Sequence, residues 1–144
     1  MNATSEFIAT RGSRLALRRF RTFGSQQRSE EFHVEVLDVL ELDSDERVAA
    51  RVVFDPNDFD TAITELDARY RAGEAAAHAH TWSLTTAAYA AINRHELAEL
   101  TPDWVSIDHR RGASFATGDM VSYVHALWDD APDIKVYIEN VHRL

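Results

Sequence analysis

Two neighbouring residues of this 144-residue sequence, Asp108 and His109, have the side chains needed for acid–base chemistry. A desolvated imidazole can act as a general base near neutral pH, and a carboxylate can do the same work. Because side chains alternate across a β-strand, only one of the two can enter a pocket from the strand predicted at 104–111. His109 shares its side of that strand with Val105 and Ile107, so it enters if the apolar side faces the pocket. The alternative is that one of the two pairs with a following arginine and only holds the strand in place.

Five aromatic residues form a candidate lining for a pocket that binds a small apolar ligand, because aromatic side chains commonly wall such sites. They are Trp82, Tyr89, Trp104, Trp128 and Tyr137. Aromatic residues at these spacings more often belong to a hydrophobic core, so ligand binding and ordinary packing both remain open. In a catalytic version of the site, Tyr89 or Tyr137 would donate a hydrogen bond to the substrate.

No metal or cofactor site is predicted. His78 and His80 are two residues apart, and on a helix such residues point in different directions, so they do not chelate one ion. The sequence has no glycine-rich phosphate loop and no Gly-x-Ser-x-Gly motif for a serine nucleophile.

The composition is that of a single globular domain, with 45% hydrophobic and 27% charged residues. The lack of cysteine excludes disulfides and favours a reducing compartment, so a cytoplasmic location is expected. No segment has the length and apolarity of a membrane span, and no secretory signal is visible. The net charge of −9 disfavours nucleic-acid and membrane partners, so the arginines crowded into residues 11–28 are interpreted as the solvated face of a strand.

Hydrophobic periodicity predicts an α+β chain. Alternating patterns indicate an antiparallel meander of strands at 7–10, 15–23, 32–42 and 47–54. A helix follows, with Asp55 as its N-cap, Pro56 at its first position and Gly73 as a left-handed C-terminal cap. The remaining predicted elements are helices at 74–93 and 95–100, a strand at 104–111, a helix through 120–128 and a strand at 134–142.

From Ala77 onward, the order of motifs resembles the first half of a nuclear transport factor 2-like domain of the SnoaL-like subgroup. The resemblance lies in the helix with Trp82 and Tyr89, then in Thr101-Pro102-Asp103-Trp104, and then in Ile107-Asp108-His109-Arg110. Residues 7–74 resemble the second half of such a domain followed by a linker helix. The resemblance implies a curved antiparallel sheet packed against helices in a cone-shaped cup.

The two halves stand in permuted order, which resembles the C-terminal regions of multidomain actinobacterial regulators. Residues 1–74 would be the strand-rich second half of one unit, and residues 75–144 the helix-rich first half of the next. Together they would form one compact domain, either closed as a circular permutant or completed by exchange between two chains of a homodimer. A third possibility is that the chain is a fragment of a longer protein.

The resemblance implies a non-catalytic module, accessory to a larger regulatory or signalling protein, that binds a small apolar ligand or mediates dimerisation. The alternative is a small-molecule enzyme of the ketosteroid isomerase-like kind, an isomerase, cyclase or hydrolase, with His109 or Asp108 as its acid–base group. Whether the chain is an enzyme is therefore left open.

Overall fold

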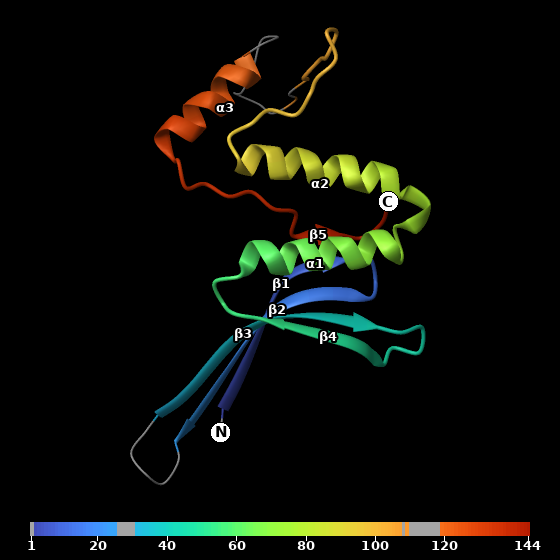
Figure 1. Cartoon of the computed structure of the whole chain (residues 1–144), viewed down its shortest axis with the longest axis vertical. Coiled ribbons are helices and arrows are strands. Elements are labelled where there is room, and N and C mark those ends of the chain that lie inside the picture. The colour runs from blue at the N-terminus through green and yellow to red at the C-terminus, as the bar shows by residue number, and fades with distance from the viewer. Residues whose placement is uncertain (1, 26–30, 108, 110–118) are drawn as a thin grey trace. The chain divides into compact units, whose positions relative to one another are not determined.

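The computed structural model describes residues 2–25, 31–107, 109 and 119–144 of the chain. They divide into two compact units (Figure 1). The first unit comprises Met1–Ser83 and Ile138–Leu144, and the second comprises Leu84–Tyr137. Each unit is considered by itself.

A five-stranded sheet with the order β4-β3-β2-β1-β5 forms the framework of the first unit. The first four strands make the predicted antiparallel meander, and the short β5 pairs with β1 in parallel, so the sheet is mixed. The prediction of an α+β chain is thereby confirmed. The strands are β1 Asn2–Arg11, β2 Leu15–Ser25, β3 Glu31–Leu42, β4 Val48–Phe54 and β5 Asn140–Val141.

The predicted strand at 134–142 is wrong in length, because only Asn140 and Val141 join the sheet. A side chain supplies hydrogen-bond partners for part of the remaining backbone. Within the second unit, Asn93 accepts a hydrogen bond from Val136 N at 2.8 Å and donates one to Val136 O at 2.9 Å. This amide replaces the strand partner that Val136 would otherwise need.

A β-bulge in β1 decides which of its side chains enter the core. The register with β2 passes from Phe7 opposite Arg18 to Ala9 opposite Leu17, so Ile8 is the extra residue. A bulge of one residue changes the side to which the following residues point. As a result Ala9 is buried with Leu17, whereas Phe7 lies on the other face of the sheet and is 66% exposed.

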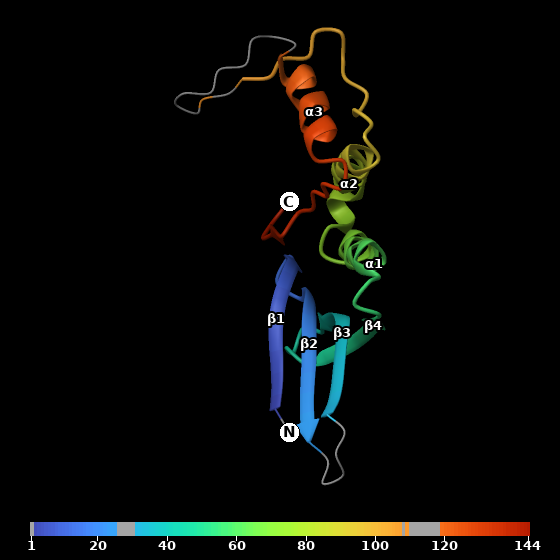
Figure 2. The same cartoon turned by 90° about the vertical axis from the view of Figure 1, so that its left-hand side faces the viewer.

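Helix α1 (Phe59–Ala72) covers one face of the sheet (Figures 1 and 2). Its buried stripe of Ala62, Leu66 and Tyr70 follows the helical repeat. Tyr70 meets the ring of Trp82 edge to face, with the ring centroids 5.3 Å apart. The buried members of this core are Ala9, Leu15, Leu17, Leu37, Val39, Ala62, Leu66, Tyr70, Ala75 and Trp82.

The predicted start of α1 is wrong, and its predicted end at Gly73 is correct in position but not in conformation. The helix begins at Phe59 with Asp58 as its N-cap, because Asp55 forms a turn of its own instead. The Asp55 carboxylate accepts a hydrogen bond from Asn57 N at 3.0 Å, and Asp55 O accepts one from Asp58 N at 2.9 Å. At the other end Gly73 has φ −105°, which is not the left-handed conformation.

The predicted helix at 74–93 is divided. A short 3-10 helix, η1 (Ala76–His78), precedes α2 (Ala79–Asn93), and Glu74 lies in the turn before both. The Glu74 carboxylate accepts hydrogen bonds from Ser13 N at 3.1 Å, Ser13 Oγ at 2.8 Å and Arg14 N at 3.2 Å. Burial opposes its ionisation, but these bonds outweigh burial and hold the pKa of Glu74 below its usual value.

The second unit contains the rest of α2 and the helix α3 (Asp119–Asp130), which confirms the helix predicted through 120–128. The predicted helix at 95–100 is wrong, because residues 96–100 have no regular structure and His95 takes a positive φ of 60°. The ring of His95 stacks on Trp128 with centroids 5.3 Å apart. Residues 104–107 and 109 form no strand, and the rest of the strand predicted at 104–111 lies outside the described residues.

Gly12 supplies the first testable prediction. Its φ is +57°, and a Cβ at this position would overlap the Glu74 carboxylate. We expect Gly12→Ala to lower the free energy of unfolding by about 1–3 kcal/mol, because the backbone strain adds to the loss of the Glu74 contacts. Denaturant unfolding followed by circular dichroism measures this change.

Gly24→Ala is the matched control, because nothing lies within 4 Å of a Cβ at Gly24 and its φ is not positive. Equal unfolding free energies for the two variants would contradict the requirement for glycine at position 12, in the β1–β2 turn.

Candidate functional site

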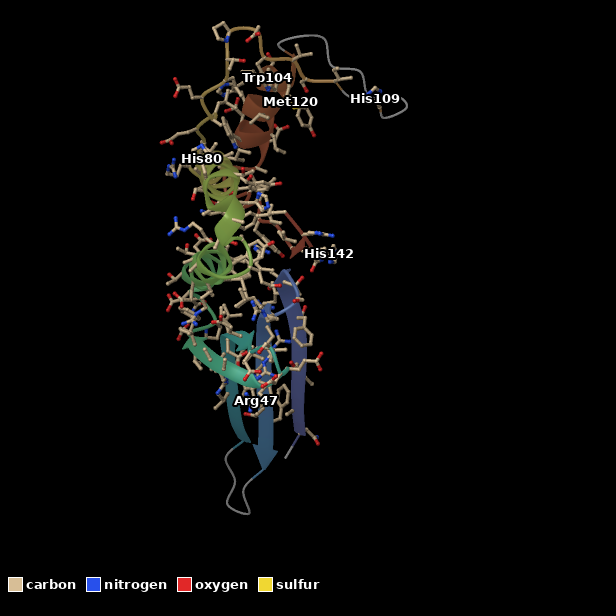
Figure 3. All side chains as sticks on the ribbon, turned by 90° about the vertical axis from the view of Figure 1, so that its right-hand side faces the viewer. Arg47, His80, Trp104, His109, Met120 and His142 are labelled. Carbon is tan, nitrogen blue, oxygen red and sulfur yellow. The ribbon has the colours of Figure 1, made fainter. Side chains whose placement is uncertain are left out.

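Of the two residues predicted to carry acid–base chemistry, the structure describes only one. Asp108 lies outside the described residues, and His109 is exposed (Figure 3). Val105 and Ile107, expected to mark the pocket side, are 65% and 71% exposed, so the apolar side of this segment does not face a core. A catalytic role for Asp108 or His109 stays a prediction.

The five aromatic residues proposed as a ligand lining fall in both units. Trp82 is buried in the core of the first unit, and Trp128 is buried in the second. Trp104 is half-buried, whereas Tyr89 and Tyr137 are 37% and 38% exposed. Ligand contact by these residues stays a prediction.

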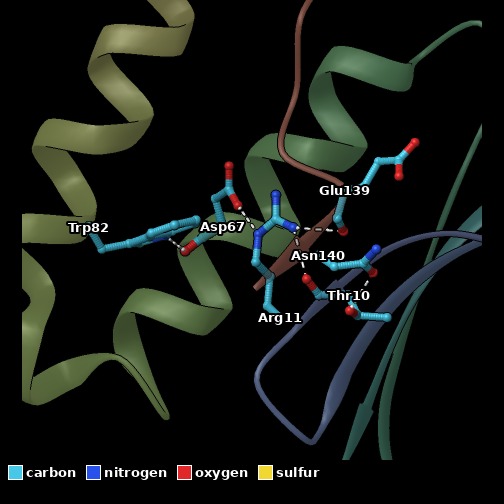
Figure 4. A network of polar contacts seen from close by, with 6 residues as sticks. All are labelled: Thr10, Arg11, Asp67, Trp82, Glu139 and Asn140. Atoms are coloured by element: carbon cyan, nitrogen blue, oxygen red, sulfur yellow. Dashed lines mark hydrogen bonds and ion pairs between the residues drawn. The ribbon is translucent and has the colours of Figure 1, made fainter. Parts of the chain in front are cut away.

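Arg11, at the end of β1, is a fully buried charged residue of the first unit (Figure 4). Because the bulge at Ile8 turns Arg11 toward the core, its guanidinium lies under α1 rather than in water. Its Nε donates to Asp67 Oδ1 at 2.7 Å, and its Nη1 donates to Thr10 O at 2.9 Å and to Glu139 O at 3.3 Å. One guanidinium thus joins β1, α1 and the C-terminal segment.

Asp67 and Trp82 complete this cluster. The guanidinium of Arg11 lies 5.4 Å from the centroid of the Trp82 ring, and Trp82 Nε1 donates to Asp67 O at 3.3 Å. Burial raises the pKa of the Asp67 carboxyl, and the adjacent Arg11 only partly offsets that effect. Arg11 Nη2 is buried and has no hydrogen-bond partner in the described part of the chain.

A second buried carboxylate, Asp38, points to the opposite face of the sheet, because its neighbours Leu37 and Val39 both face α1. Arg18 binds it through two bonds, from Nε at 2.6 Å and from Nη2 at 3.1 Å, and Arg51 Nε donates to it at 2.7 Å. Burial opposes its ionisation, but the two guanidiniums outweigh burial and hold the pKa of Asp38 below its ordinary value.

Neither cluster offers a titrating acid–base pair to a substrate, because the partner of each carboxylate is a guanidinium, which stays protonated in proteins. Among residues 2–25, 31–107, 109 and 119–144, no group of three or more histidines and carboxylates is placed to hold a metal ion. The chemistry that these contacts support is therefore structural.

The sequence patterns did not predict the ion pair of Arg11 with Asp67, or the ion pairs of Asp38. The one available signal was Asp38, which interrupts the apolar alternation of its strand. The interpretation of the N-terminal arginines as a solvated face is wrong for Arg11, which is fully buried. Arg19 and Arg21 also form ion pairs across the sheet, both with Glu35.

No protein-family model matches this chain, and no curated protein or solved structure is significantly similar to it. In the described part of the chain, no helix has both the length and the apolar character needed to cross a membrane. The function is therefore inferred from the geometry of the residues themselves, and the family resemblance stays a prediction from its motifs.

The buried pair of Arg11 and Asp67 supplies the second prediction. Arg11→Met or Asp67→Leu alone leaves an uncompensated charge in the core, so each is expected to lower the free energy of unfolding by about 3–5 kcal/mol. The double substitution removes both charges and should cost much less than the sum of the two. Denaturant unfolding of the four proteins measures the coupling, and additive costs would show that the pair is not energetically coupled.

The third prediction concerns pH. Because the pKa of Asp38 is lower in the folded chain than in the unfolded one, its ion pairs stabilise the fold above the unfolded pKa of about 3.9. That contribution is lost as the pH falls through the folded pKa. The stability difference between the native chain and Asp38→Asn should therefore be large at pH 7 and shrink on acidification below pH 4.

Asp45→Asn serves as the control for the pH series, because the Asp45 side chain is 69% exposed in the hairpin between β3 and β4. Exposed pairs contribute little to stability, so this variant should follow the native chain at every pH. An Asp38→Asn difference that stays constant from pH 7 to pH 3 would contradict the assignment.

Proposed function

We propose that this chain is a non-catalytic module that associates with a second copy of itself, as an accessory part of a larger regulatory protein. The supporting observation is the face of the sheet opposite α1, named here the open face. Registers across the four long strands assign to it the line Phe7, Arg18, Asp38 and Val53. Its apolar members include Phe7 at 66% exposed and Val53 at 48% exposed.

Exposed apolar side chains on one sheet face favour association with another protein surface. The buried Asp38 lies on this face and binds both Arg18 and Arg51, so its carboxylate is paired, and the three groups together carry one net positive charge. The exposed apolar side chains of the open face therefore favour its burial against a second copy.

The distribution of carboxylates also favours a non-catalytic role. Asp38, Asp67 and Glu74 are each bound by arginine or by backbone amides rather than directed to a free space. Binding of a small apolar ligand by the predicted aromatic residues is a separate property, which the proposal neither requires nor excludes.

The fourth prediction is the mass of the chain in solution. Light scattering across a dilution series should give twice the monomer mass of 16.3 kDa and a return toward the monomer at the lowest concentrations. A monomer at every concentration, with native circular dichroism, would refute the assembly proposal.

A further inference from the structure

Residues 103–107 of the second unit have an exposed side that combines one acidic and two apolar residues. Exposure alternates along this segment, because Trp104 and Ser106 are half-buried whereas Asp103, Val105 and Ile107 are exposed. Such alternation is typical of an extended segment, in which every second side chain points to the same side. The outward side therefore carries a carboxylate followed by two β-branched apolar side chains, and we name it the acidic segment.

The open face has the complementary composition. Its centre is the cluster of Arg18, Asp38 and Arg51, in which two guanidiniums share one carboxylate and leave one net positive charge. Arg51 binds Asp38 through Nε, and its side chain is 45% exposed. A guanidinium has five N–H donors, so Arg51 can bind a second carboxylate without releasing Asp38.

Apolar side chains lie on both sides of this positive centre. In the line across the strands, Phe7 flanks Arg18 and Val53 flanks Asp38, and both apolar residues are exposed. Covering the open face with a purely apolar surface would leave its extra positive charge desolvated and unpaired. A surface that brings one carboxylate among apolar side chains avoids that cost, and the acidic segment is such a surface.

We propose that the acidic segment of one copy packs on the open face of another, with Asp103 at Arg18 and Arg51 and with Val105 and Ile107 against the apolar side chains beside them. This inference rests on the proposed assembly function and identifies the second surface of its interface. Each copy supplies one segment and one face, so a two-fold dimer contains two identical contacts and is closed.

Charge reversal tests the contact at the positive centre. Asp103→Lys should weaken dimerisation about tenfold or more, because a further positive charge then meets the centre. Asp130→Lys is the matched control, since it makes the same change of net charge at an exposed residue of α3 outside both surfaces. Sedimentation equilibrium of the three chains gives the dimer dissociation constants, and circular dichroism checks that each variant is folded.

Apolar truncation tests the rest of the contact. The double variant Val105→Ser with Ile107→Ser should also weaken dimerisation about tenfold or more, because two apolar side chains no longer leave water on association. Both residues are exposed in the described structure, so the fold of each copy should be unchanged.

Cross-linking between copies identifies the two surfaces directly. The chain has no cysteine, so introduced thiols are the only ones present. A copy with Val105→Cys, mixed with an isotopically labelled copy with Val53→Cys, should be joined by a short bis-maleimide. Ala68→Cys replaces Val53→Cys in the control, because Ala68 is exposed on α1, which covers the opposite face of the sheet.

The outcomes separate this contact from dimerisation itself. A native dimer that neither Asp103→Lys nor the double serine variant weakens would overturn the proposed contact and leave the assembly function standing. Linking of Val105→Cys to Ala68→Cys as readily as to Val53→Cys would overturn it as well. A native chain that is monomeric at every concentration would instead refute the proposed function.

Discussion

The buried guanidinium of Arg11 joins segments that are far apart in the sequence of the first unit. It binds Asp67 of α1, 56 residues away, and the carbonyl of Glu139, 128 residues away. Because a buried arginine keeps its charge, the chain must bring these acceptors to it or leave the charge unpaired. The short β5 strand and the position of α1 over the sheet both follow from meeting that requirement, together with the apolar core around Leu66 and Trp82.

The two buried carboxylates, one on each face of the sheet, have pKa values shifted in opposite directions. Asp67 has one arginine partner and a pKa raised by burial, whereas Asp38 has two partners and a lowered pKa. The bonds from two guanidiniums outweigh burial at Asp38, whereas the single guanidinium of Arg11 does not outweigh burial at Asp67. Near neutral pH the ionised Asp38 carboxylate stabilises the fold, whereas burial under α1 opposes the ionisation of Asp67.

Much of the fold could be predicted from local patterns. The alternation of apolar residues located β2, β3 and β4, and helical spacing located α1 and α3, because each element buries one side of its own sequence. The errors occurred where a distant group competes with local preference. The Asn93 amide forms hydrogen bonds with the backbone N–H and C=O of Val136, 43 residues away. The expected long final strand is reduced to two residues. The Arg11 cluster was missed for the same reason, since no local pattern links residues 11 and 67.

The bulge at Ile8 makes β1 a strand whose two halves belong to different surfaces. Phe7, before the bulge, lies on the open face. After the bulge, Ala9 and Arg11 point to the core on the opposite face. Removal of Ile8 would close the bulge and leave Phe7 opposite Arg18 and Ala9 opposite Leu17 in a regular register, so each half of β1 would keep its face. The extra residue thus sets the length of β1 without setting which β2 residues its two halves oppose.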